Sequence, residues 1–220
     1  MPQDQRDATL PEFALRRRRA MAGAAAWLVG LALPAGAQSP AVDPAVASIR
    51  AFYEVLLDVM KHADKLGVRG RYDKLAPAIH AAYDLPAMTR IAIGPDWSTI
   101  PPEQQAALID AFSRRSIATY ANRFDGYSGQ SFEVDPEVET RNTGRIVRSK
   151  LIRPPEFPVT LNYLMRGSGD TWKIVDVYLA GFISEMATQR TEFGAILQKG
   201  GPAALIESLH QQIDKLMRKA

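Results

Sequence analysis

The sequence contains no cysteine, and this absence excludes several kinds of protein. Without thiols there is no disulfide framework, no thiolate zinc site, no cysteine nucleophile and no acceptor for a bacterial lipoprotein anchor. Histidine is almost as scarce. The three histidines, His62, His80 and His210, fall on separate predicted helices, with no spacing that would pair them on a metal. We therefore expect neither a metal nor a cofactor.

Motifs for phosphate binding and for serine hydrolysis are also missing from the sequence. It has no glycine-rich phosphate loop and no G-x-S-x-G turn. Ser184 follows Gly181, but it stands at a predicted helix start, where a hydroxyl more often caps the helix. The sequence therefore offers no nucleophile of the familiar kinds.

A strong excess of one charge is lacking once the first residues are set aside. The chain has 27 Lys and Arg residues against 24 Asp and Glu residues. Residues 1–37 hold five of the basic and three of the acidic residues, which leaves 22 against 21. So balanced a chain has no basic surface for nucleic acid, and nucleic acid is not expected as a partner.

The first 37 residues have the pattern of a secretory signal peptide. Arg16 to Arg19 form a basic segment, Ala20 to Leu33 an apolar segment too short to span a membrane comfortably, and Ala35-Gly36-Ala37 a cleavage signal. We predict cleavage before Gln38 and release of the protein into the periplasm. An uncleaved membrane anchor is the alternative, and the export route, Sec or twin-arginine, stays open.

Apolar residues at helical spacing predict helices at both ends of a single domain over residues 46–217, after a linker at 38–45. The expected helices span 46–60, 71–82, a short segment capped by Asp84, 102–124, 183–197 and 202–216. Gly200 and Gly201 separate the last two.

Between these helices the apolar spacing changes from helical to twofold. The pattern predicts strands at 132–138, 146–152, 157–165 and 170–179. Pro154-Pro155 and Gly167-Ser168-Gly169 are turn residues between neighbouring strands, so the pairing should be antiparallel. The sequence thus predicts an α+β fold, with a twisted antiparallel sheet of about four strands wrapped by N-terminal and C-terminal helices.

One face of this sheet is expected to be apolar and covered by helices. It carries Val147, Leu151, Val159, Leu161, Tyr163 and Met165. In the fourth strand, alternation places Val175 and Val177 on a common side. Such a face either packs as a dry core or leaves a gap beneath the helices, and the pattern does not distinguish the two.

Asp176 is a carboxylate in the middle of the otherwise apolar fourth strand. It is either a general base in a pocket or a buried structural hydrogen-bond partner. We favour the structural interpretation, because buried carboxylates are usually paired, and Arg190 is a candidate partner.

Two blocks of sequence together carry a family resemblance. The first comprises Tyr83-Asp84-Leu85 to Ile93-Gly94, Trp97, and Tyr120 to Gly129; the second comprises Thr171 to Val177, Gly181, Ser184, Gln189-Arg190, Phe193, Leu197 and Gly200. Over roughly Val46 to Leu209 the chain resembles the MlaC family, also called the toluene-tolerance auxiliary component. The segment Ile183 to Phe193 looks most like HpnM, the branch associated with hopanoid biosynthesis. Proteins of the MlaC family are secreted and carry lipid between the inner and outer membranes of Gram-negative bacteria.

The resemblance implies an apolar cavity for acyl chains, with the lipid head group facing water. It makes the apolar sheet residues, including Val175 and Val177, candidate lipid-binding residues. Arg145, Arg148 and Lys150 become candidates for meeting an anionic head group at the cavity rim, with a solvated strand face as the alternative.

The resulting hypothesis is a non-enzymatic, monomeric periplasmic lipid carrier. It would bind a lipid with an acyl or polycyclic apolar body, phospholipid or hopanoid, and would dock to lipid transport complexes at both membranes. Hydrophobic burial would supply the binding energy. Two other classes stay open: a hydrolase or isomerase with a pocket around Asp176, and a structural adaptor with a dry core.

Overall fold

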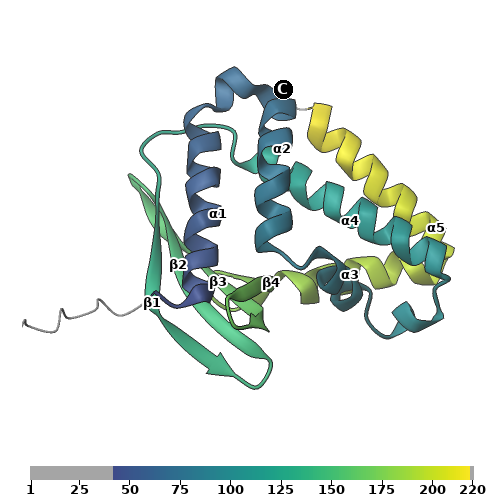
Figure 1. The fold of residues 1–220 in the computed structure, drawn as a ribbon. Coiled ribbons are helices and arrows are strands. Elements are labelled where there is room, and N and C mark those ends of the chain that lie inside the picture. The colour runs from purple at the N-terminus through teal and green to yellow at the C-terminus, as the bar shows by residue number, and fades with distance from the viewer. Residues whose placement is uncertain (1–41, 219–220) are drawn as a thin grey trace, which may run out of the picture. The chain divides into compact units, whose positions relative to one another are not determined.

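The computed structural model describes residues 42–218, so the predicted signal peptide and most of the predicted linker lie outside the described residues. The helices are α1 (Pro44–Lys61), α2 (Ala63–Ala82), α3 (Leu85–Ile93), the 3-10 helix η1 (Gly94–Thr99), α4 (Pro102–Arg123) and α5 (Glu185–Arg218). The strands are β1 (Ser131–Arg141), β2 (Gly144–Arg153), β3 (Glu156–Ser168), β4 (Thr171–Leu179) and β5 (Ile183–Ser184). The predicted α+β class is confirmed (Figure 1).

The strands form one antiparallel sheet in the order in which they occur along the chain, β1-β2-β3-β4-β5. The four predicted strands are confirmed, and β5 adds a fifth of two residues. The turn between β3 and β4 requires Gly167, since a Cβ atom there would lie 1.9 Å from the carbonyl oxygen of Thr171. No other residue would fit this close approach of two backbones.

A β-bulge in β4 overturns the prediction that Val175 and Val177 share a face. Leu164 pairs with Asp176, whereas Met165 pairs with Ile174, so Val175 is the extra residue. Val177 lies in the main core, but Val175 lies in a second buried cluster with Ile146 and Leu164. The extra residue interrupts the alternation on which the prediction relied.

Local sequence signals set the helix ends. The Asp43 carboxylate accepts a hydrogen bond from the amide of Ala45 at 2.8 Å at the start of α1, and the Asp84 carboxylate accepts one from the amide of Ala87 at 2.9 Å. Gly201 has a φ of 69° inside α5, so the two predicted C-terminal helices are confirmed as two segments that meet at a kink. The helix predicted to begin at residue 71 extends back to Ala63 and is broken at Gly67, where φ is 59°.

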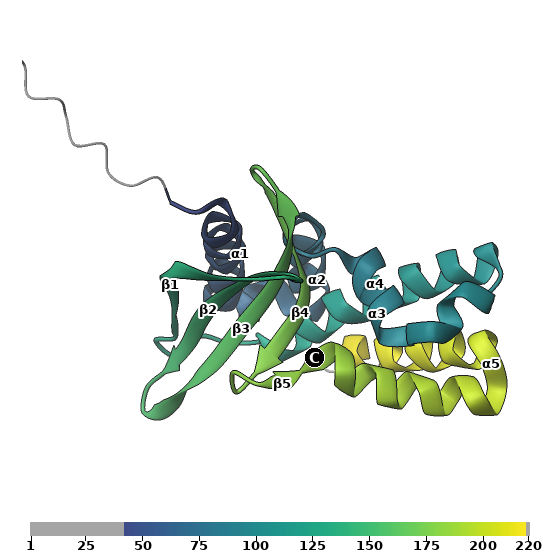
Figure 2. The same ribbon diagram turned by 90° about the horizontal axis from the view of Figure 1, so that it is seen from below.

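The main core lies between the helices and one face of the sheet. α1 packs on the sheet, α2 stands between α1 and α4, and α4 runs beside α5 in both views (Figures 1 and 2). Ile49 and Phe52 of α1 are buried in the same cluster as Val147 and Tyr163 of the sheet. On the opposite sheet face, Ala87 and Ile91 of α3 cover the smaller cluster around Val175.

Within residues 42–218, no helix has both the length and the apolar character needed to cross a membrane. In the same part of the chain, no three His, Asp or Glu side chains gather closely enough to hold a metal ion.

Candidate ligand-binding pocket

A pocket of about 150 Å³ lies between the covered face of the sheet and the helices. Helices α1 to α5 and strands β1, β3 and β4 all contribute to its wall. The lining residues are Tyr53, Leu56, Ile79, Tyr83, Leu85, Met88, Phe112, Arg115, Ser116, Thr119, Tyr120, Arg123, Phe124, Phe132, Leu161, Tyr163, Val177, Leu179, Glu185, Met186 and Gln189.

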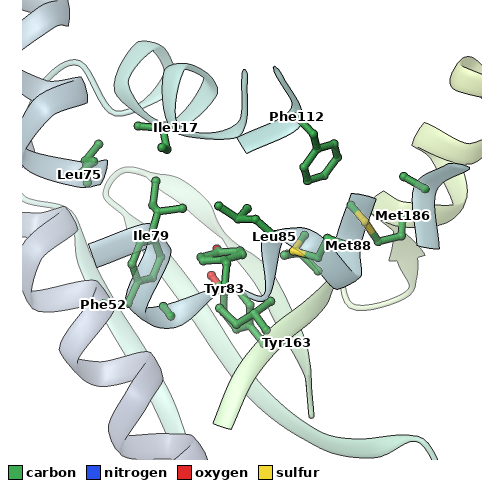
Figure 3. Close-up of a cluster of buried hydrophobic side chains, with 14 of the residues drawn as sticks. Phe52, Leu75, Ile79, Tyr83, Leu85, Met88, Phe112, Ile117, Tyr163 and Met186 are labelled. Carbon is green, nitrogen blue, oxygen red and sulfur yellow. The ribbon is translucent and has the colours of Figure 1, made fainter. Parts of the chain in front are cut away.

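Most of this wall is apolar or aromatic. Figure 3 shows Phe112 pointing from α4 toward Leu85 and Met88, with Tyr83 and Tyr163 on the side of the sheet. Cavities of this size that are lined by apolar side chains take apolar guests. The pocket therefore suits the apolar body of a ligand.

Four tyrosines place hydroxyl groups within the apolar wall. The Tyr53 hydroxyl is hydrogen-bonded to those of Ser149 at 2.7 Å and Tyr163 at 2.8 Å, and the Tyr83 hydroxyl is hydrogen-bonded to that of Tyr120. Burial raises the pKa of Tyr120 to about 12 and also raises the pKa values of the other three. All four phenols are therefore uncharged at physiological pH.

Charged residues enter the lining from α4 and α5. Arg115 is half-buried, and its Nε donates a hydrogen bond to Oε1 of Gln212 at 2.7 Å. Burial lowers the pKa of Arg115, while the negative charges of Glu192 and Glu185 act in the opposite direction. Arg123 is exposed and Glu185 is half-buried, so this part of the wall reaches toward solvent.

The structure separates the predicted lipid-binding residues into groups. Leu161, Tyr163 and Val177 line the pocket. Val147 and Met165 are fully buried in the main core and do not belong to the lining, and Leu151 and Val159 also lie outside it. Val175 faces the other cluster. Their roles in lipid binding stay predictions.

The predicted rim residues lie away from the pocket lining. Arg145 forms an ion pair with Asp43 at 2.8 Å, and its guanidinium lies 4.1 Å from the centre of the Trp172 ring. Arg148 is paired with Glu139, and Lys150 is exposed. Alternation along β2 explains the last two positions, since Arg148 and Lys150 point away from the face that carries Val147.

Asp176 is held by three hydrogen bonds and lies outside the pocket lining. Its carboxylate accepts from the amide of Val177 at 2.8 Å, the hydroxyl of Ser184 at 2.6 Å and the amide of Met186 at 3.1 Å. The suggestion that Arg190 is its partner is wrong, because Arg190 donates to the carbonyl oxygen of Ile91 at 2.9 and 2.6 Å. These contacts favour the structural interpretation of Asp176.

Sequence reasoning missed the contribution of α4 to the pocket. Phe112, Ser116, Thr119, Tyr120 and Arg123 line it from one side of this helix. Their spacing of three and four residues is the available signal, because such residues share a helix face. That spacing shows a common face but not what the face covers.

A five-stranded antiparallel sheet whose helices enclose a mainly apolar pocket defines a binding protein for an apolar ligand. The chain belongs to the MlaC family, whose sequence model, described as "MlaC protein", matches residues 50–211. A solved structure of a phospholipid-binding protein from Ralstonia solanacearum, in complex with a phospholipid, is similar to this chain. The two are 25% identical with a TM-score of 0.69, and the match covers 79% of this chain and 99% of that one. No curated protein matches the sequence.

Proposed function

We propose that this protein is a lipid carrier that holds the apolar body of a lipid in the pocket between its sheet and its helices. The observation that carries the proposal is the pocket itself, which is lined by apolar and aromatic side chains from every α-helix of the described chain. Membership of the MlaC family and the phospholipid bound to the Ralstonia protein support a lipid as the ligand.

The size of the pocket bears on how a carrier would load and release its lipid. Pockets for small molecules usually measure about 300 to 1,000 Å³, whereas this one measures about 150 Å³. A lipid therefore has to widen it by moving the helices apart from the sheet. Each buried methylene contributes about 0.8 kcal/mol, and the cost of widening offsets part of that gain. The lipid would then be held without being trapped.

The carrier would act in the periplasm after cleavage of the signal before Gln38. It would move phospholipid, hopanoid or both between the inner and outer membranes, as a monomer that docks to a lipid transport complex at each. Family membership supports the periplasmic location, and the likeness of Ile183 to Phe193 to the HpnM branch supports the hopanoid.

Catalysis is not part of the proposal. Asp176 lies outside the pocket lining, and three hydrogen bonds occupy its carboxylate. A hydrolase or isomerase would need this carboxylate to face its substrate.

Native mass spectrometry of the protein purified from its own periplasm tests the carrier function. We expect a bound lipid mass that disappears after delipidation and returns on incubation with lipid vesicles. A protein that carries no lipid and takes none up would overturn the proposal and favour a protein-binding adaptor.

Two tryptophan substitutions connect the bound lipid to the pocket. Leu161 lines the pocket and is half-buried, so Leu161→Trp should reduce lipid uptake while the melting temperature stays close to that of the wild type. Val147 is fully buried outside the lining, so Val147→Trp should overpack the core and cost about 1 to 3 kcal/mol. Normal uptake by folded Leu161→Trp would show that the lipid binds elsewhere.

A further inference from the structure

One part of the pocket wall carries a cluster of polar side chains that an acyl chain does not require. Tyr83 and Tyr120 meet there, and Glu185 and Gln189 come from the first turns of α5. Nε2 of Gln189 donates to Oε2 of Glu185 at 3.4 Å. Burial raises the pKa values of both phenols, and the negative charge of Glu185 raises them further.

A count of protons shows that the tyrosine pair has a spare donor. Two phenols carry two hydroxyl protons, and their mutual hydrogen bond uses one of them. Neither hydroxyl makes another hydrogen bond with residues 42–218. One O–H group is therefore left to donate to a ligand.

The same cluster contains an acceptor without a partner. Oε1 of Gln189 is buried and has no hydrogen bond to any residue of the described chain, although only 8% of Gln189 is exposed. A buried amide oxygen without a partner is unfavourable, because it has lost its hydration and gained nothing in return. A ligand group that donates to this oxygen would remove the cost once the pocket widens.

A hydroxyl is the group that matches both free positions. It donates one hydrogen bond and accepts another, so it fits Oε1 of Gln189 and the spare phenol together. A phosphate is negatively charged at neutral pH, so the negative charge of Glu185 repels it. An ammonium group accepts no hydrogen bond, so it leaves the phenol unpaired.

We propose that Tyr83, Tyr120, Glu185 and Gln189 form a hydroxyl-binding niche, and that the preferred lipid carries an uncharged hydroxyl on the part that enters the pocket. This inference rests on the proposed carrier function and specifies its ligand. It distinguishes a hydroxylated neutral lipid from one whose phosphate enters the pocket.

Three probes that share one alkyl chain test the niche. Delipidated protein is titrated by calorimetry with dodecanol, with its methyl ether and with dodecyl phosphate. The ether keeps the acceptor oxygen of the alcohol but loses its donor. We expect dodecanol to bind about tenfold more tightly than the ether, the ratio for one lost hydrogen bond of typical strength, and more tightly than the phosphate.

Two variants assign this preference to the niche. Gln189→Leu removes the unpaired acceptor and should bring the alcohol and the ether to equal affinity. Ser113→Ala removes another buried hydroxyl of α4, one that lies outside the lining and already donates to the carbonyl oxygen of Ile109. It should keep the full preference.

The possible results separate this inference from the carrier function. The niche is wrong if the wild type binds the alcohol and the ether equally, or if it binds dodecyl phosphate more tightly than the alcohol. Neither result contradicts the carrier function. A preference that survives in Gln189→Leu also overturns the niche. If no probe binds, the niche is wrong, and the carrier function falls with it only if the purified protein also carries no lipid.

Discussion

Asp176 joins the end of the sheet to the start of α5. Its carboxylate receives hydrogen bonds from Val177 in β4 and from Ser184 and Met186 at the β5–α5 junction. Oγ of Ser184 in turn accepts from the amide of Ala187 at 2.9 Å and so caps the helix, as predicted from the sequence. Asp176, which the sequence offered as a possible general base, therefore fixes the start of the helix that carries Glu185 and Gln189 into the pocket.

The variant Asp176→Asn should lower the free energy of unfolding by about 1 to 3 kcal/mol. An amide replaces one acceptor oxygen with a donor, and that donor faces the buried N–H and O–H groups that the carboxylate now satisfies. Urea denaturation at neutral pH measures the change. Asp214→Asn, at an exposed position, is the matched control and should stay within about 0.5 kcal/mol of the wild type. Unchanged stability of Asp176→Asn together with loss of a chemical activity would instead support the general-base interpretation.

Single residues also show how far alternation predicts the direction of a side chain. Alternation placed Leu161 and Tyr163 on one face of the third strand and Val177 on one side of the fourth, and all three line the pocket, while their roles in lipid binding stay predictions. Val175 was assigned in the same way, but the bulge reverses its direction. Side chains alternate between the two faces only where the pairing register with the neighbouring strand is unbroken. The bulge arises from the pairing of β4 with β3 and not from a local sequence pattern in β4.

At the scale of elements, α5 consists of two helical segments joined at Gly201. Its φ of 69° lies in a region that residues with a Cβ atom rarely adopt, and Pro202 follows in the first turn of the second segment. The first segment carries the pocket residues, while Leu205 and Leu209 of the second are buried in the core. The kink allows one long helix both to line the pocket and to pack in the core.

Two glycine-to-alanine substitutions in α5 should change stability in opposite directions. An added Cβ atom meets nothing within 4 Å at either Gly194 or Gly201, so backbone conformation decides the outcome. Gly201→Ala should cost about 1 to 3 kcal/mol, because φ is positive there. Gly194→Ala should add about 0.5 to 1 kcal/mol, because Gly194 lies inside a regular helical segment. Thermal and urea unfolding of the two variants give the comparison, and a stabilised Gly201→Ala would show that the kink is not required.

Elements were easier to predict than the pocket because their signals are local. The caps at Asp84 and Ser184 and the stop at Gly201 depend on a few neighbouring residues, and the structure agrees with each. The pocket depends on which face of α4 meets α5 and the sheet. A row of residues such as Phe112, Ser116 and Thr119 does not encode that tertiary arrangement.

On the scale of the whole molecule, the four pocket tyrosines connect α1, α4, β3 and the segment between α2 and α3. Burial raises the pKa of each above the ordinary value of 10.0, so the folded state holds these phenol protons more tightly than the unfolded chain does. Their contribution to stability is complete below pH 10 and is lost as the pH rises beyond it.

Alkaline titration should therefore unfold the protein. Above about pH 10, each phenol that ionises only in the unfolded chain should lower the free energy of unfolding by about 1.4 kcal/mol per pH unit. The chain has seven tyrosines, so the test uses a variant in which Tyr72, Tyr127 and Tyr178 are replaced by Phe and only the four pocket tyrosines remain. In this variant, phenolate absorbance and circular dichroism, followed together, should change in one transition. Tyr120→Phe should make the pH dependence less steep, because the pKa of Tyr120 is about 12 in the folded state. Pocket phenols that titrate near pH 10 while the helical signal persists would contradict this expectation.

The order of strands in the sheet has a consequence for how the protein folds. Each strand pairs with its neighbour along the chain, so every hairpin closes a short loop at a small entropic cost. The pocket wall, by contrast, brings Tyr53 of α1 together with Met186 of α5, from opposite ends of the described chain. We therefore expect the hairpins to form early and the pocket to close late, after the rate-limiting step. A ligand that binds only the completed pocket then leaves the rate of folding unchanged and lengthens the lifetime of the folded molecule.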